Sequence, residues 1–456
     1  MLTNLSLGRV IGYFTLIYAF IAFAFSQSFT SPQREYYTYL YWAELKREDL
    51  YYSKVGPLID GIDSSISLLT FYAFEQDNNR IFNADLFPEF TVNNSDSPNI
   101  RLFGSVQINL SANLSIQNEF EFDNKGSDDS NFMGTQRISA GDWVGYLQHS
   151  TLSWYYRSGF FSIGRGNPFF ISPNESVFLN AAIPPLEHIN WSHKKNDFHF
   201  NWAIMLSKSN QKNRFISFHR YGLHKPKLNL GFTEAVIGTY DNWSSDEIGY
   251  ILPASVLLET EENRGINANL VWVLDGKVKW KQWMAYFEIL IDDFALDGGS
   301  PPQIGGIVGI SRKVQKFLAN LEYTRVNRWT GNHCNPLNSW IENQIPIGHS
   351  IGSDAHQFIL SSFYSINKKS NIETKLIWGE NGIGSPIDRL MEWPVAVACD
   401  QNFGYNKEIF PSSSNSSLSG QIKFSCILKK NLLFKLGLVI DKKKSSDILM
   451  TLNYKL

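Results

Sequence analysis

Several long stretches of the chain alternate apolar and polar residues with a period of two. From Leu418 to Leu428 every second residue is apolar or glycine, and Gln421 and Lys423 stand between them. The same alternation runs through residues 432–440 and 448–456, and near the other end through 100–110 and 114–122. Successive side chains of a β-strand point to opposite faces, so each stretch predicts a strand with one apolar and one polar face.

The length of these strands favours a membrane barrel over a soluble β-sandwich. Sandwich strands are usually shorter, and their apolar faces are packed by a second sheet. A strand of about ten residues with one apolar and one polar face suits a wall between lipid and a wet lumen. We therefore predict an all-β fold, a transmembrane antiparallel β-barrel of about 18 strands.

The predicted connections alternate between short and long, as in outer-membrane barrels with short periplasmic turns and long outer loops. Short turns are predicted near Ser111, Ser158, Lys194, Lys225, Gly276, Lys313, Lys369 and Lys430. Long segments are predicted at residues 74–99, 123–142, 166–185, 239–263, 289–302, 328–354 and 381–417. An even number of strands places both ends of the mature chain in the periplasm.

The first residues predict export. Arg9 precedes an apolar run from Val10 to Phe25, which is short for a membrane span and ends before Gln27 in a form typical of a signal peptide. We expect residues 1–26 to be a signal peptide and 63–456 to form the barrel. Apolar residues recur at helical spacing in 27–62, which predicts a short periplasmic helical segment that either plugs the barrel base or only tethers it.

Composition adds limits on function. Aromatic residues make up 14% of the chain, which suits interfacial girdles, and the formal net charge of −2 offers no bulk attraction to nucleic acid. The three cysteines leave at least one unpaired. Cys334 and Cys399 fall in outer loops on the same side and are a candidate disulfide or two free thiols, whereas Cys426 falls on a lipid face.

His349, Ser353, Asp354 and His356 lie close together in the sequence and are candidates for catalysis. Such residues can form a hydrolase triad or a metal site. The sequence has no nucleophile-elbow, paired-cysteine or phosphate-loop motif. We therefore expect no enzymatic activity, no metal and no cofactor.

Two charged residues break the strand alternation. Glu234 shares a face with the apolar residues Leu230 and Phe232, and Arg325 shares one with Leu321. A charge facing hydrocarbon is costly, so either a bulge turns these side chains inward or they lie above the lipid at the outer rim. Both readings place charge near the outer mouth, where it either ties strands together or contacts a ligand.

An ordered set of segments resembles the capsule assembly Wzi family. The segments are GFTEAVIG at 231–238, LPASVLLETEENRGINANL at 252–270, YFEILIDDF at 286–294, LEYTRVNRW at 321–329 and GHSIGSDAHQ at 348–357, with a weaker match of IGRGNPFF at 163–170. The resemblance implies an eighteen-stranded barrel with a periplasmic helical part that binds exported polysaccharide and helps attach it to the cell surface.

The positions that match the family are Glu234, Asn263, Glu288, Asp292, Asp293, Glu322, Tyr323, Arg325, His349 and Asp354. Matching leaves open whether these residues bind sugar or brace the barrel. Sugars are bound by aromatic faces together with planar polar groups. The candidate ligand-binding residues are therefore Glu234, Asp292, Asp293, Arg325, Arg328, Trp329, His349 and Asp354.

Two functions from different classes follow. The first is a barrel of the cell outer membrane that binds capsular or exopolysaccharide, with outer-membrane lipid and a polysaccharide export machinery as further partners and no nucleic acid. The second is a porin or solute channel, which the inward charges Glu119, Glu121, Lys423 and Lys435 favour.

Overall fold

A computed structural model describes most of the chain from residue 82 onward. The described residues are 82–92, 99–111, 113–124, 139–140, 143–166, 176–179, 183–209, 212–240, 245–264, 268–293, 302–367, 369–391, 414–429, 432–441 and 447–454. The predicted signal peptide and the predicted helical segment 27–62 lie outside them. Among the described residues, no helix combines the length and hydropathy needed to span a membrane.

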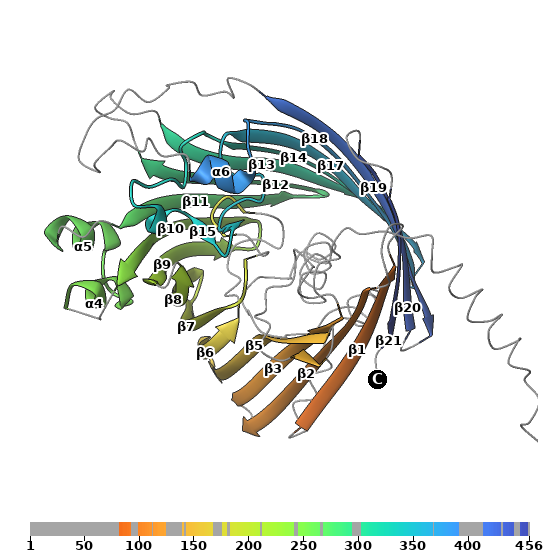
Figure 1. Ribbon diagram of the computed structural model, residues 1–456, viewed down its shortest axis with the longest axis horizontal. Coiled ribbons are helices and arrows are strands. Elements are labelled where there is room, and N and C mark those ends of the chain that lie inside the picture. Colours follow the sequence, from red (N-terminus) through yellow and green to blue (C-terminus); the bar gives the residue numbers. More distant parts are fainter. Residues whose placement is uncertain are drawn as a thin grey trace, which may run out of the picture.

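The described strands form one large antiparallel sheet with a small hairpin beside it (Figure 1). The strands of the large sheet are β1 (Phe82–Val92), β2 (Asn99–Ser111), β3 (Leu114–Asp123), β4 (Ser139–Ala140), β5 (Trp143–Tyr156), β6 (Gly159–Gly166), β7 (Leu186–Lys195), β8 (Phe198–Ser209), β9 (Lys212–Lys225), β10 (Leu228–Tyr240), β11 (Asn269–Trp280), β12 (Trp283–Asp293), β13 (Gln303–Val314), β14 (Phe317–Val326), β17 (Ala355–Asn367), β18 (Ser370–Asn381), β19 (Asn415–Lys429), β20 (Leu432–Asp441) and β21 (Asp447–Tyr454). The remaining elements are the hairpin of β15 (Ile341–Glu342) and β16 (Ile345–Pro346), the helices α4 (Ser245–Ile251), α5 (Leu257–Arg264) and α6 (Pro386–Leu390), and the 3-10 turn η1 (Pro336–Asn338).

The strand pairing closes the sheet into a barrel. Of its 19 strands, β4 has only two residues. The other 18 pair in chain order, and β1 pairs back with β21, for example Phe90 with Leu452. The prediction of a transmembrane antiparallel barrel of about 18 strands is confirmed.

Two predicted connections are wrong. The predicted outer loop 74–99 contains β1, whose alternation is broken by Phe87 and which includes a proline, Pro88. Gly276 lies in the middle of β11, and the turn falls at residues 281–282. Glycine in a strand often marks close packing instead of a turn, and a Cβ at Gly276 would meet the ring of Phe287 at 2.4 Å.

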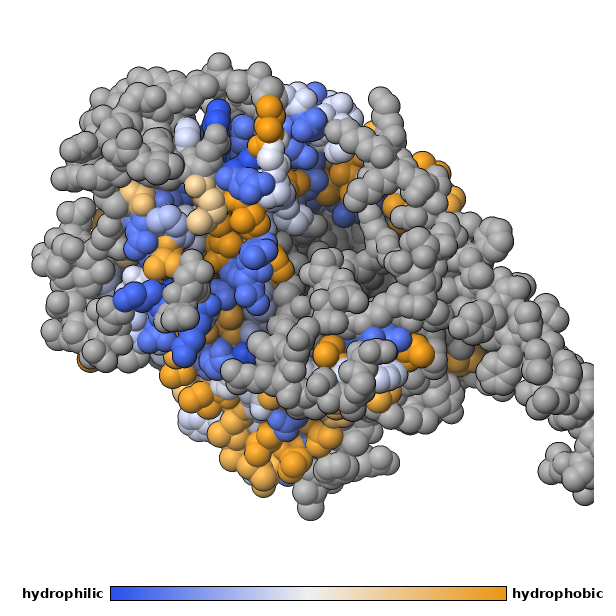
Figure 2. Space-filling view, in the orientation of Figure 1, coloured by the Kyte–Doolittle hydropathy of each residue, from blue (hydrophilic) through white to orange (hydrophobic). Residues whose placement is uncertain are grey.

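The two faces of the barrel differ as the alternation predicts. Leu321, Leu360 and Ile422 point outward and are exposed, whereas Glu119, Glu322 and Ser425 point inward and are buried. In the space-filling view, apolar residues gather at the lower edge and hydrophilic residues lie toward the centre (Figure 2). The exposed outward residues form the apolar band that contacts lipid.

The extracellular halves of β8–β11 break this rule because both of their faces are covered. Ala235, Val236 and Ile237 are consecutive in β10, and each has no exposed surface. Ala235 and Ile237 point inward and belong to a core inside the barrel, whereas Val236 points outward and belongs to a second core outside it. A strand covered on both faces reads as a continuous apolar run, which explains why the alternation fails here.

Candidate functional site at the barrel mouth

The extracellular mouth is built from loops that fold into the lumen. The principal one, here called the strap, comprises residues 327–354 between β14 and β17 and contains η1, β15 and β16. Residues 176–179 and 183–185, between β6 and β7, form a second inner segment, and α6 follows β18. Buried apolar residues join these loops to the inner wall, namely Val177, Phe178, Ile183, Trp340 and Ile347 with residues of β7–β14.

Phe178 is the centre of this inner core. Its ring lies 5.6 Å from that of Phe218 on β9 and 5.7 Å from that of Trp340 in the strap. The side chain has no exposed surface. Burying a phenylalanine contributes roughly 1.5–3 kcal/mol, so the inner segment and the strap stabilise each other's position against the wall.

Arg214 of β9 fastens the far end of the strap. Its guanidinium donates hydrogen bonds to Ser339 O at 3.0 Å and Ile341 O at 2.8 Å, and it lies 3.5 Å from the Glu342 carboxylate. Both side chains are almost fully buried. The strap therefore reaches from β14 to β9, which lies five strands away around the barrel.

Asp292 fastens the near end of the strap. Its carboxylate accepts a hydrogen bond from Gly331 N at 2.7 Å. Gly331 has φ +83, a conformation that favours glycine, and this conformation directs its N–H at the β12 wall. The predicted ligand residue Asp292 thus contacts the protein's own backbone.

Glu288 fastens the inner segment in the same way. It accepts hydrogen bonds from Ser176 Oγ at 2.5 Å and from Phe178 N at 2.9 Å. These residues are more than a hundred positions away in the sequence. The carboxylate on β12 thereby fixes the inner segment that carries Phe178 into the core.

Arg389 of α6 joins the end of the strap to the β18–α6 connection. It donates to the carbonyls of Ser353, Gly382, Gly384 and Ile351, and only 3% of its surface is exposed. A single guanidinium with several donors suits a site where carbonyls from two loops converge. Asp354 connects the same loops through its backbone, because its carbonyl accepts from Gly382 N at 2.8 Å.

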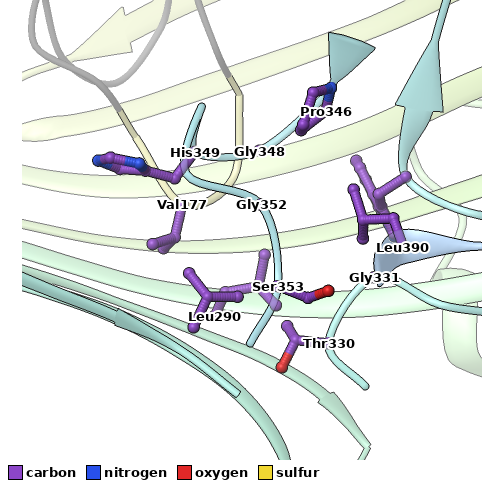
Figure 3. Close-up of a pocket in the computed structure, with 12 residues that line it drawn as sticks. Val177, Leu290, Thr330, Gly331, Pro346, Gly348, His349, Gly352, Ser353 and Leu390 are labelled. Atoms are coloured by element: carbon purple, nitrogen blue, oxygen red, sulfur yellow. The ribbon is translucent and has the colours of Figure 1, made fainter. Parts of the chain in front are cut away.

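A small cavity lies between the strap, α6 and the wall. Apolar side chains of Val177, Leu290 and Leu390 surround it, with the hydroxyls of Thr330 and Ser353 beside them (Figure 3). Its volume is about 30 Å³, enough for water but far too small for a sugar ring. The cavity is therefore a packing feature beneath the mouth and not a glycan pocket.

The cluster considered for catalysis does not assemble a nucleophile. His349 Nδ1 accepts from Ile351 N at 3.2 Å, and its Nε2 lies 3.2 Å from the Gln357 amide. Ser353 Oγ makes no hydrogen bond to any described residue, so His349 does not activate it here. No group of three or more possible metal-binding side chains is found within the described ranges.

Burial shifts the pKa values of two mouth residues. Burial raises the pKa of the Glu342 carboxyl, and the neighbouring Arg214 opposes that effect. Burial lowers the pKa of the His333 imidazole, which keeps the ring neutral near pH 7. The charge of Glu342 therefore depends on how firmly the strap stays docked against Arg214.

Glu234 and Arg325 lie on the outside of the barrel. Pairing of β10 and β14 with their neighbours continues without a bulge past both residues, so the inward alternative is wrong. Arg325 Nε lies 3.4 Å from Asn327 Oδ1, and the nearby Tyr323 and His356 are joined at 3.4 Å on the same outward face. Neither charge borders the lumen.

Three further residues predicted to bind a ligand are Asp293, Arg328 and Trp329. Trp329 is 6% exposed, and the Arg328 guanidinium lies 5.3 Å from the centre of its ring, so the ring is packed. Asp293 is the last residue of β12, and the structure does not describe its side chain. Ligand contact by these residues stays a prediction.

The structure shows the bonding state of two of the three cysteines. Cys334 is disulfide-bonded, and Cys426 is free on the outward face of β19. Cys399 lies outside the described residues. Its pairing with Cys334 therefore stays a prediction.

Sequence reasoning missed the residues that hold the mouth together, chiefly Arg214 and Arg389. Neither arginine belongs to a recognisable sequence motif. The acceptors of both are backbone carbonyls, which every residue has, so the sequence does not identify the partners. One signal could have identified Arg214: it shares a strand face with the apolar residues Ile216 and Phe218, and a charge on such a face needs a partner.

No protein-family model and no curated protein sequence matches the chain. Among solved structures, Wzi of Escherichia coli, described as a carbohydrate-binding β-barrel of the outer membrane involved in group 1 capsule assembly, is similar with 13% identity and a TM-score of 0.56, covering 95% of this chain and 94% of that one. The outer-membrane protein OpdK of Pseudomonas aeruginosa is similar with 9% identity and a TM-score of 0.50, covering 82% and 98%. At these identities the likeness establishes the fold. The chain is an outer-membrane β-barrel with the fold of Wzi, as the ordered segments predicted.

Proposed function

We propose that this barrel binds capsular or exported polysaccharide at its extracellular mouth and helps to assemble or attach the glycan at the cell surface. The observation that carries the proposal is the closed packing of the strap and the inner segment inside the barrel. Loops held in one arrangement form a shaped platform, and a platform suits recognition of a polymer better than passage of a solute.

The fold supports the same proposal, because the similar barrel Wzi is described as carbohydrate-binding. Three of the ligand-binding residues predicted from the sequence, Asp292, His349 and Asp354, hold the platform together through their contacts. We add four exposed polar residues of the platform as candidates for direct contact, which the sequence did not indicate: Asn343, Gln344, Ser350 and Asp388.

The test is saturable binding of the detergent-purified barrel to the surface polysaccharide of its source organism. Asn343 and Gln344 form the turn between β15 and β16, with φ values of +50 and +62. Glycine adopts these angles readily, so the double variant Asn343→Gly/Gln344→Gly removes both amides without straining the turn. We expect its affinity to fall several-fold.

Lys281→Gly is the matched control, because Lys281 is an exposed turn residue with φ +53 at the opposite end of the barrel. Its binding should equal that of the unchanged protein. If the unchanged barrel binds no polysaccharide at all, the proposal fails.

A solute channel is the second candidate, and the charged wall of β2 and β3 favours it. Arg101 Nε lies 2.9 Å from Asp123 and 3.7 Å from Glu121 on the inward face. The described members of the inner core come from other strands and loops. Steady ion conductance of the purified barrel in planar bilayers, without glycan binding, would favour the channel.

A further inference from the structure

The helices α4 and α5 lie on the outside of the barrel wall, left in Figure 1. Buried Tyr250 of α4 and Leu257 at the start of α5 share a hydrophobic core with Trp202 and Phe215. The next residues along those strands, Ala203 and Ile216, belong to the inner core. Adjacent strand residues point to opposite faces, so the two helices, here called the outer pair, cover the outward face.

Polar contacts fix the outer pair to the wall. The Glu234 carboxylate accepts hydrogen bonds from Leu257 N at 2.8 Å and Leu258 N at 3.1 Å, which are the first amides of α5. His219 Nε2 donates to Leu252 O at 3.1 Å. Glu234 and His219 are paired residues on neighbouring strands. An acidic group at a helix N-terminus is favourable because it accepts the unpaired N–H groups there.

The outer pair begins where the lipid-facing band ends. Phe232, two residues below Glu234 on the same face of β10, is exposed, and its partner Leu274 on β11 is exposed as well. One step higher, Glu234 pairs with Trp272. A two-residue step along a strand is about 7 Å, so the helices lie directly against the upper edge of the band.

Apolar side chains continue the band onto the helices. Ile248 is 42% exposed, Leu252 is 48% exposed and Val256 is 55% exposed. These residues belong to α4 and to the connection before α5. They contrast with Tyr250 and Leu257 of the same segment, which have no exposed surface because they pack on the wall.

We propose that the outer pair is a lipid-contacting element that rests in the outer leaflet, with Ile248, Leu252 and Val256 among the acyl chains. Short amphipathic helices commonly lie in this way at a membrane interface. The occupant is lipid because the exposed residues are continuous with the lipid-facing band. The same cover accounts for Glu234, a carboxylate at an outward strand position that is only 7% exposed.

The test uses nitroxide labels at Leu252→Cys and Val256→Cys. The background is Cys426→Ala, which removes the free thiol, and Cys334 is already in a disulfide. The full barrel is reconstituted in vesicles of phosphatidylcholine and phosphatidylglycerol, and accessibility to oxygen and to a water-soluble nickel chelate is measured by electron paramagnetic resonance. Leu321→Cys, an exposed band position, is the lipid reference, and Ile383→Cys, in the loop before α6, is the water reference.

Labels at positions 252 and 256 should show an oxygen-to-nickel ratio several-fold above that at position 383 and close to that at 321. A ratio equal to that at 383 would place the helices in water and overturn the proposal. Low accessibility to both reagents, with label-to-label coupling between molecules, would show that a second copy covers the pair and would also overturn it. Heat-dependent gel mobility verifies that each variant has folded.

Discussion

Individual charged residues in this barrel act chiefly on backbone groups. Glu234 accepts from the first backbone N–H groups of α5, Glu288 and Asp292 accept from those of loops, and Arg214 and Arg389 donate to loop carbonyls. A buried backbone group without a partner is costly, so a charged side chain on a rigid strand is an efficient means of holding a loop. The positions that match the family therefore also have a structural role.

Changing Glu234 tests this role at one residue. Glu234→Ala removes the acceptor for Leu257 N and Leu258 N and should weaken docking of α5 by about 1 kcal/mol, as loss of a helix cap does. Glu234→Gln should cost less, because one carbonyl oxygen remains. Hydrogen exchange at the amides of residues 257 and 258 measures the effect. Lys281→Gln, at an exposed turn on the opposite end of the barrel, is the control, and equal exchange in all variants would contradict the capping role.

The strap is the element on which the state of the mouth depends. It starts and ends at Asn327 and Asp354, whose backbone groups are joined at 3.3 Å, and it is held at Arg214 of β9, five strands away from β14. Trp340 and Ile347 of the strap belong to the inner core, and polar contacts hold it at both ends and at Arg214. Such an element is docked or released as a unit, which makes it testable by a change at its far end.

Arg214→Ala should release the far end of the strap. The change removes two hydrogen bonds and leaves Glu342 buried without its cation, a loss of about 3 kcal/mol for docking. We expect the ion conductance of single barrels in planar bilayers to rise. Lys212→Ala, an exposed residue of the same strand end, should leave conductance unchanged. A conductance that does not respond to Arg214→Ala would mean that other parts of the chain close the lumen.

Docking of the strap should also depend on pH through Glu342. Burial raises the pKa of this carboxyl above its ordinary value of 4.5 in the docked strap. A raised folded-state pKa means that the docked form binds the proton more tightly, so its contribution is complete below pH 4.5 and is lost as the pH rises through the docked pKa. A nitroxide at position 344 should become more mobile over that rise, and Glu342→Gln should remove this part of the dependence while leaving the opposite contribution of the buried His333, whose pKa is lowered. A mobility profile that is the same in the unchanged protein and in Glu342→Gln would contradict the role of Glu342.

At the scale of the whole molecule, the barrel is a continuous wall with two coverings. The inner core joins the strap and inner segment to β7–β14, and the outer core joins α4 and α5 to β8–β11. Because the first strand pairs with the last, the barrel has no free edge, and both coverings pack on one continuous sheet. The lipid band and the lumen face are consequences of that closure.

Closure and its register can be tested by cross-linking. Thr91 of β1 pairs with Thr451 of β21. The pair Thr91→Cys/Thr451→Cys, in the Cys426→Ala background, should form a disulfide on mild oxidation, because directly paired positions have Cβ atoms about 5 Å apart. Thr91→Cys/Leu449→Cys, displaced by two residues, should cross-link poorly. Equal yields would show that the register is not fixed.

The sequence by itself determined the wall of this protein, and the tertiary structure decided what covers it. Alternation at residues 100–122 and 418–456 predicted strands, faces and approximate number because the period of two depends only on lipid on one side and polar surroundings on the other. The coverings depend on contacts between distant residues, such as Arg214 with Ser339 and Glu288 with Phe178, separated by 125 and 110 positions. Local sequence patterns do not identify such partners, because a carboxylate or guanidinium can form hydrogen bonds with any backbone group that the fold places beside it.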